Sequence, residues 1–142
     1  KARALTKSHT AHLIIGSDQV AVINDKILTK PGNMETATQQ LQMCSGKTVT
    51  FLTGLCLLNS KTGQAQTSCE TFQVTFLTLN AKQIENYLIK EEPYDCAGSF
   101  KSEGLGVTLF EKMHGDDPNT LIGLPLIALC RMLRDEGVEP LR

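Results

Sequence analysis

The chain has 142 residues, of which 41% are hydrophobic and 20% are charged, and its formal net charge is -1. This balance fits a single globular domain over residues 1–142 that is large enough to bury a core without disulfides. The near-neutral charge gives no reason to expect a nucleic-acid partner. No apolar run is long enough to cross a bilayer, so no membrane partner is expected.

Five cysteines stand at positions 44, 56, 69, 96 and 130, and no CxxC pair is present. An odd number of cysteines among apolar or small neighbours argues against a disulfide framework or a zinc site. We therefore expect reduced thiols in a cytoplasmic protein.

The chain begins with five good helix formers, Lys1–Leu5, with no N-cap before them, and the segment extends to Lys7. We expect them to be the last part of a helix that begins upstream, which makes the chain a fragment without its N-terminal part. Leu13–Ile15 then form an apolar run, which is typical of a strand buried on both faces.

Asp18 follows that apolar run after Gly16 and Ser17. Ligands of α/β proteins bind beyond the carboxyl ends of strands, so Asp18 is a candidate functional residue. An Asp in this place equally suits a turn cap, and the local sequence leaves both interpretations open. Lys30 precedes Pro31 on a stiff loop and is a candidate phosphate ligand, with a solvated surface lysine as the alternative.

Periodicity and capping residues predict the remaining elements. These are a helix over 34–44 capped by Asn33, a hairpin of strands over 48–59 and 67–77, a helix over 81–90 capped by Asn80, a strand over 106–113 and a helix over 126–133. The expected fold is α/β, with a mixed, twisted sheet that contains the long antiparallel hairpin and is flanked by helices. A cleft is expected over Asp18.

A second informative stretch runs from residue 94 to residue 104 and combines small residues with two carboxylates and a lysine. Its Glu103 is able to accept hydrogen bonds from a nucleobase or to coordinate a metal, and the alternative is a solvated loop residue. The chain contains no P-loop, no GxSxG motif and no metal-type histidine spacing. Carboxylates with lysines fit metal-assisted attack of water on a phosphoanhydride.

A series of short motifs in a fixed order carries a family resemblance: Lys1-Ala2, Ile14-Ile15-Gly16-Ser17-Asp18-Gln19, Thr29-Lys30-Pro31, Thr53-Gly54, Asp95-Cys96-Ala97-Gly98-Ser99-Phe100 and Gly123-Leu124-Pro125-Leu126. Together they resemble the Maf family of nucleoside triphosphate pyrophosphatases, once called septum-formation inhibitors, which have a Maf/ITPase-like fold. The resemblance implies hydrolysis of the α–β phosphoanhydride of a noncanonical or modified nucleotide. It also implies a divalent metal, Mg²⁺ or Mn²⁺, and a homodimer.

The same resemblance implies roles for individual residues. Asp18 is the general base for the attacking water, and Lys30 and Lys1 lie near the phosphates. Gln19 and Glu103 stand where the family tunes base choice, and this pair is similar to the subgroup that acts on 7-methyl-GTP. A carboxylate suits 7-methylguanine, which is cationic and presents N1–H and amine donors.

Two other functions stay open at this point. One is a pyrophosphatase of the dTTP/UTP type, and the other is a non-catalytic nucleotide-binding regulator of cell division. The family's N-terminal phosphate-binding loop and metal-binding Glu have no counterpart in the sequence. We therefore expect the chain alone to be impaired in activity, and we assign no metal ligands.

Overall fold

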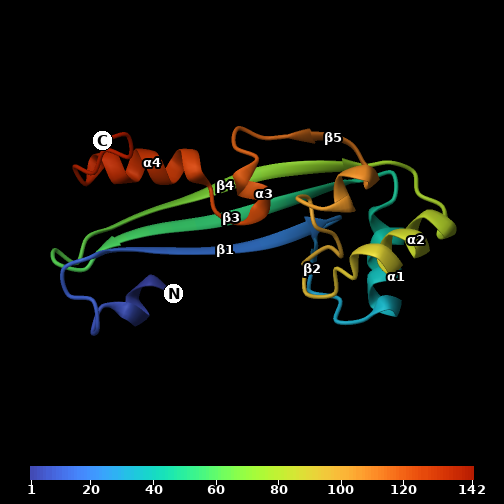
Figure 1. Ribbon diagram of the computed structural model, residues 1–142, viewed down its shortest axis with the longest axis horizontal. Coiled ribbons are helices and arrows are strands. Elements are labelled where there is room, and N and C mark those ends of the chain that lie inside the picture. The colour runs from blue at the N-terminus through green and yellow to red at the C-terminus, as the bar shows by residue number, and fades with distance from the viewer. The chain divides into compact units, whose positions relative to one another are not determined.

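The computed structural model describes residues 1–142 and contains one five-stranded sheet in the order β2-β1-β3-β4-β5 (Figure 1). The strands are β1 (Leu13–Ile23), β2 (Lys26–Leu28), β3 (Thr48–Asn59), β4 (Ala65–Phe76) and β5 (Phe110–His114). The helices are α1 (Met34–Cys44), α2 (Ala81–Glu91), α3 (Asn119–Ile122) and α4 (Leu126–Asp135), with short 3-10 helices η1 (Ala2–Leu5) and η2 (Leu105–Leu109). The expected α/β class and long β3–β4 hairpin are confirmed.

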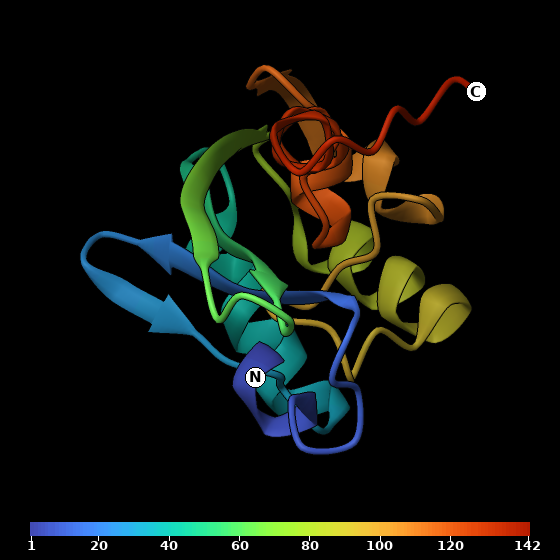
Figure 2. The same ribbon diagram turned by 90° about the vertical axis from the view of Figure 1, so that its left-hand side faces the viewer.

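The sheet is antiparallel, where we expected a mixed one. β1 pairs antiparallel with β2 through a tight turn, which Figure 2 shows, and β4 pairs antiparallel with β5. β1 also runs antiparallel to β3, since His12 is bonded to Ser60 while Asp18 lies beside Gly54. Short turns join β1 to β2 and β3 to β4, and such turns reverse the chain. The α1 crossover instead joins β2 to β3, which are not neighbours in the sheet.

β1 is an uninterrupted strand of 11 residues, so Asp18 lies within it rather than beyond its end. The apolar run at its start is not buried on both faces, because Ile14 is buried whereas Ile15 is 45% exposed. An antiparallel strand with one covered face alternates in this way. The expectation that the run is buried on both faces, with Asp18 just beyond the buried strand, is therefore wrong.

The chain divides into two compact units, and the long strands contribute to both. The first unit comprises residues 1–19, 53–71 and 117–142, and the second comprises residues 20–52 and 72–116. A single domain over residues 1–142 stays a prediction. In the first unit, one face of α4 packs on β3 through a cluster formed by Leu55, Leu57, Ala128, Leu129 and Met132.

The second unit has an aromatic centre. Its rings contact one another edge to face, with centroids 5.0 to 5.5 Å apart, and belong to Phe51, Phe76, Phe100 and Phe110. This geometry is the one that aromatic quadrupoles favour. It holds the backbone at residue 100, directly before the loop of residues 101–105 that carries Glu103.

Both predicted helix caps of the second unit are confirmed. The Asn33 side chain accepts a hydrogen bond from Thr36 N at the start of α1, and Asn80 forms a reciprocal capping box with Gln83 at the start of α2. The two helices pack against each other. None of the helices combines the length and apolarity that a membrane span requires.

The strand predicted over 106–113 begins later than expected, because residues 105–109 form η2 and β5 starts at Phe110. Gly106 explains the difference: its N–H donates to Lys101 O at 3.0 Å, and a Cβ on this residue would lie 2.2 Å from that oxygen. The chain thus folds back on itself at Gly106 before it enters the sheet.

Candidate active site

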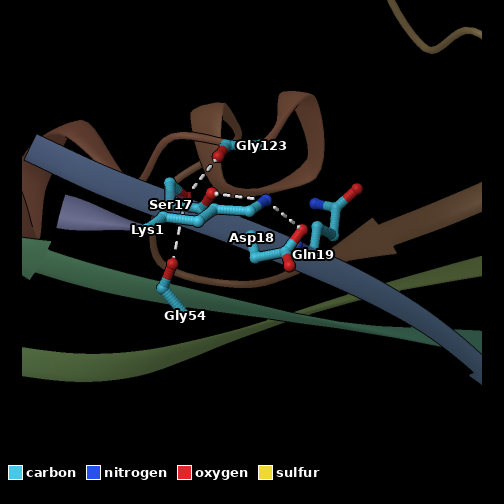
Figure 3. A network of polar contacts seen from close by, with 6 residues as sticks. All are labelled: Lys1, Ser17, Asp18, Gln19, Gly54 and Gly123. Carbon is cyan, nitrogen blue, oxygen red and sulfur yellow. Dashed lines mark hydrogen bonds and ion pairs between the residues drawn. The ribbon is translucent and has the colours of Figure 1, made fainter. Parts of the chain in front are cut away.

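η1 packs closely on β1 at Gly16, and this contact sets the position of Lys1. A Cβ on Gly16 would lie 3.1 Å from Ala2 N and 3.3 Å from Ala2 Cβ, so a glycine permits the close approach. Lys1 Nζ then lies 2.8 Å from Asp18 Oδ1 and 3.3 Å from Ser17 O (Figure 3). The structure therefore brings together two of the predicted site residues, Lys1 and Asp18.

The surroundings of Asp18 keep its carboxyl ionised. The hydrogen bond from Lys1 is the main cause that lowers the pKa of Asp18, followed by a bond from Gln19 N at 3.1 Å and by the charge of Lys1. The Lys1 and Asp18 side chains are 63% and 75% exposed, so their ion pair adds little to stability. Its consequence is chemical, since an ionised carboxylate is free to accept a proton.

Asp18 borders a surface cavity of about 510 Å³ in the first unit. Lys1 and Arg3 bring positive charge to the cavity wall, and Ser68 lines it from β4. Ser68 Oγ is a buried polar atom without a hydrogen-bond partner. Cations and a hydroxyl are groups that bind phosphate oxygens. Sequence reasoning missed both additions; Arg3 stands beside the Lys1-Ala2 motif, whereas Ser68 lies in an ordinary alternating strand and gave no signal.

A divalent metal requires several oxygen ligands, and Mg²⁺ favours near-octahedral coordination. Asp18 is the one carboxylate among the residues that line the cavity, and no cluster of three or more His, Cys, Asp or Glu side chains occurs in the structure. The residues present therefore do not by themselves make up a Mg²⁺ or Mn²⁺ site.

Ser17 and Gln19 leave β1 on the face opposite to Asp18, as the two-residue period of a strand requires. Ser17 Oγ lies between two carbonyl oxygens, 2.7 Å from Gly123 O and 3.0 Å from Gly54 O (Figure 3). The hydroxyl thus connects β1 to β3 and to the residue that ends α3.

Gln19 is tied to α3 through its amide nitrogen. Gln19 Nε2 donates to Thr120 O at 2.7 Å and to Thr53 Oγ1 at 2.8 Å, with Leu121 O at 3.2 Å. Thr53 Oγ1 itself donates to Thr120 O at 3.0 Å. The donors of Gln19 are therefore occupied within the protein, and its Oε1 is the atom left for a ligand. Gln19 does not line the cavity beside Asp18.

Asp117 holds α3 where Gln19 reaches it. The Asp117 side chain is buried and accepts bonds from Asn119 N at 2.9 Å, from Asn119 Nδ2 at 2.8 Å and from Ile127 N at 2.8 Å. Burial raises the pKa of Asp117, but these bonds outweigh it and leave the pKa below its ordinary value. Sequence analysis assigned no element between the strand expected over 106–113 and the helix expected over 126–133, and so missed both α3 and Asp117.

The other two candidates, Lys30 and Glu103, belong to the second unit and are exposed. The loop after Lys30 is held by a bond from Gly32 N to Tyr94 O of 2.9 Å. Glu103 Oε2 accepts a bond from the Ser102 hydroxyl at 3.2 Å. Both charged groups thus extend from exposed loops of ordered backbone.

Comparison with known proteins decides the family, because a family model described as Maf-like protein matches residues 1–136. The chain belongs to the Maf-like protein family. A relative from Pseudomonas fluorescens Pf-5, named 7-methyl-GTP pyrophosphatase, is 61% identical over 98% of this chain and 72% of its own length. Relatives of the same name from Alcanivorax borkumensis and Pseudomonas putida are 58% and 59% identical, over 98% and 97% of this chain and 71% and 72% of their own lengths.

In this Maf-like chain the motif residues fall into three structural settings. Lys1 and Asp18 form an ion pair at the cavity of the first unit. Gln19 is bonded to α3 on the other face of β1. Lys30 and Glu103 stand on exposed loops of the second unit. The family recognition is confirmed, whereas the roles of these residues stay proposals.

Proposed function

We propose that this Maf-like chain hydrolyses 7-methyl-GTP to 7-methyl-GMP and pyrophosphate. The observation that carries the proposal is the identity of 58–61% over nearly the whole chain with relatives named for that activity. The Lys1–Asp18 pair at the cavity supports it, because it combines a proton acceptor with a cation that suits a phosphate.

In the proposed reaction Asp18 accepts a proton from the attacking water. The water oxygen bonds to the α-phosphorus, and the bond from that phosphorus to the oxygen bridging the α- and β-phosphates breaks. Pyrophosphate leaves with the bridging oxygen. The low pKa of Asp18 ensures that its carboxylate is ionised at neutral pH and ready to take the proton.

The contact with Lys1 allows the pKa of Asp18 to rise when substrate binds. In the free protein its ammonium is bonded to Asp18 and lowers the pKa of that carboxyl. A triphosphate attracts the same ammonium, and its negative charge also opposes the ionised form of Asp18. Both changes raise the pKa of Asp18 when the nucleotide is in place, and a carboxylate with a higher pKa is a better base.

The cations near the proposed substrate have distinct positions. Lys1 and Arg3 line the cavity beside Asp18 and suit the phosphates there. The role of Lys30, which belongs to the second unit, as a further phosphate ligand rests on the family resemblance alone. We assign Glu103 to the base, where its carboxylate accepts from N1–H and the exocyclic amine of 7-methylguanine.

A substrate panel tests the reaction and its specificity. The 142-residue chain is incubated with Mg²⁺ or Mn²⁺ and 7-methyl-GTP, GTP, dTTP, UTP or CTP, and the products are separated by chromatography. Because we expect the chain alone to be impaired, it is assayed beside the Pseudomonas fluorescens relative. A third sample is a chimaera in which the part of that relative outside the match is joined to this chain.

The proposal expects pyrophosphate and a monophosphate, mainly from 7-methyl-GTP. Pyrophosphate mainly from dTTP or UTP would assign the chain to the other pyrophosphatase type. A chimaera that binds these nucleotides but hydrolyses none of them, beside an active relative, would favour the non-catalytic regulator of cell division.

The role of Asp18 is tested by Asp18→Asn in the active form of the protein. This change keeps the shape of the side chain and removes the proton acceptor, so kcat should fall by about 100-fold or more. Asp135→Asn, at an exposed carboxylate of α4, is the matched control and should leave kcat unchanged. Equal turnover in both variants would remove Asp18 as the base.

Three further features belong to the proposal. The family resemblance supports Mg²⁺ or Mn²⁺ as the cofactor, which is why the assay contains both ions. The free cysteines suit a reducing compartment, so we place the activity in the cytoplasm. A homodimer stays a prediction from the family resemblance, and sedimentation of the purified chain tests it.

A further inference from the structure

Residues 101–105 form the loop that carries Glu103, and one face of α2 holds this loop at two points. Lys101 N donates to Tyr87 Oη at 3.1 Å, and Leu105 N donates to Glu91 Oε2 at 2.7 Å. Tyr87 and Glu91 are four residues apart, so they lie on the same face of the helix. Their backbone partners are also four residues apart, and Glu103 stands midway between them.

The loop is shaped to accept these anchors. A Cβ on Gly104 would lie 2.5 Å from Glu91 Oε1, so the backbone approaches the carboxylate more closely than a side chain allows. Gly104 N and Gly106 N both donate to Lys101 O, at 3.3 and 3.0 Å, and close a tight turn around Glu103. The loop therefore has little freedom while the Glu91 bond is intact.

The rest of the environment strengthens the same arrangement. Directly before the loop, Phe100 is 5% exposed and locked among the aromatic rings of the second unit. Burial raises the pKa of Tyr87 to about 12, so its hydroxyl remains neutral at physiological pH. The Glu91 carboxylate makes the stronger of the two anchors, because an ionised acceptor roughly doubles the strength of a hydrogen bond.

We infer that Tyr87 and Glu91 are positioning residues that hold Glu103 in place and thereby set the preference for a cationic 7-methylated purine over its neutral counterpart. This inference rests on the proposed function, in which Glu103 receives the base. Neither residue need touch the nucleotide. Guanine presents the same N1–H and amine donors, so the preference comes from the positive charge of the methylated base, which strengthens these bonds when the carboxylate is held in place.

The test measures binding rather than turnover, so that it does not depend on hydrolysis. Dissociation constants of the 142-residue chain are determined by calorimetry for 7-methyl-GMP and for GMP. The variants are Glu91→Ala, Glu91→Gln, Tyr87→Phe and Glu103→Gln, with Glu85→Ala as the control. Glu85 is an exposed carboxylate of the same helix whose contact is Lys82.

The wild-type chain should bind 7-methyl-GMP more tightly than GMP, and Glu103→Gln should abolish the difference. Glu91→Ala should reduce the ratio of the two constants by about fivefold or more, which corresponds to the loss of one hydrogen bond. Tyr87→Phe should reduce it less. Glu91→Gln should keep most of the wild-type ratio, because the glutamine amide oxygen accepts the same bond from Leu105 N.

Amide hydrogen exchange provides a second measurement that is independent of the ligand. The amides of Lys101 and Leu105 should exchange faster in Tyr87→Phe and Glu91→Ala respectively, while Glu85→Ala leaves both rates unchanged. If the preference persists in Glu91→Ala and Tyr87→Phe but is lost in Glu103→Gln, the positioning role of Tyr87 and Glu91 is overturned and the proposed reaction stands. Equal binding of both nucleotides by the wild-type chain also overturns the inference. An intact preference without hydrolysis by the chimaera refutes the proposed reaction and leaves the inference standing.

Discussion

Asp117→Ala is the substitution that we expect to damage the first unit most. The Asp117 carboxylate accepts from two backbone N–H groups, those of Asn119 and Ile127, and from the Asn119 side chain, at 2.8 to 2.9 Å. It therefore joins the start of α3 to the start of α4. Alanine removes all three contacts. The N–H groups of Asn119 and Ile127 then lack an acceptor in a site where the native side chain is buried.

The expected cost follows from these bonds. A hydrogen bond to a charged group contributes roughly 1.5–3 kcal/mol, but bonds to one carboxylate are not additive. We expect Asp117→Ala to lower the free energy of unfolding by about 3 kcal/mol, which for a chain of this length lowers Tm by roughly 10 °C. Asp117→Asn keeps one acceptor oxygen and should cost about half as much.

Equilibrium urea denaturation measures this effect, and its pH dependence checks the cause. Because the folded-state pKa of Asp117 is lowered, its stabilisation is fully present above the unfolded pKa, which is about 3.9. It is lost as pH falls through the folded pKa. The difference between wild type and Asp117→Asn should therefore be constant from about pH 7 to pH 5 and shrink below about pH 4.

The neighbouring Asp116 is exposed and provides the control. The free energy of unfolding of Asp116→Ala should lie within about 0.5 kcal/mol of the wild-type value. An Asp117→Ala variant as stable as wild type would rule out this role of the Asp117 carboxylate. A difference between wild type and Asp117→Asn that grows as the solution is acidified would rule it out as well.

Two further predictions concern titration and reactivity. Lys1→Met removes the main group that lowers the pKa of Asp18. The acid limb of the profile of kcat/KM against pH should therefore move to higher pH. A limb that stays in place would contradict the pairing of Lys1 with Asp18. Burial raises the pKa of Cys44 to about 12, so iodoacetamide at pH 8 should leave Cys44 unmodified while it alkylates the exposed Cys69. Peptide mass spectrometry distinguishes the two thiols, and rapid labelling of Cys44 would show that its surroundings open.

The parts of the fold that local sequence determines were predictable. Asn33 and Asn80 cap α1 and α2 through bonds to residues three positions away, so both helices follow from short stretches of sequence. η2 differs because its start depends on Glu91, which is 14 residues from Leu105 and has no local sequence signal. α3 likewise depends on the contact of Asp117 with a residue ten positions further along the chain.

The candidate site shows the same division between local and distant contacts. The motif around Asp18 drew attention to that carboxylate, yet its pairing with Lys1 requires η1 to pack on Gly16. Gln19 is predicted to contribute to the choice of base, and its amide nitrogen is already bonded to Thr120 O, 101 residues away. Residue type alone therefore identifies the chemistry of a side chain, but it does not show which groups of the folded protein the side chain is already bonded to.

The division of the first unit into three separate stretches has a consequence for biosynthesis. A ribosome releases residues 20–52 and 72–116, which make up the second unit, before it releases the closing stretch 117–142 of the first. Until that stretch emerges, Ser17 and Gln19 lack the carbonyl partners that α3 and Gly123 provide. The strand that carries Asp18 is thus synthesised well before the segment that completes its contacts. Translation that stops before residue 117 therefore yields a chain in which Ser17 and Gln19 cannot make their bonds to Gly123 O and Thr120 O.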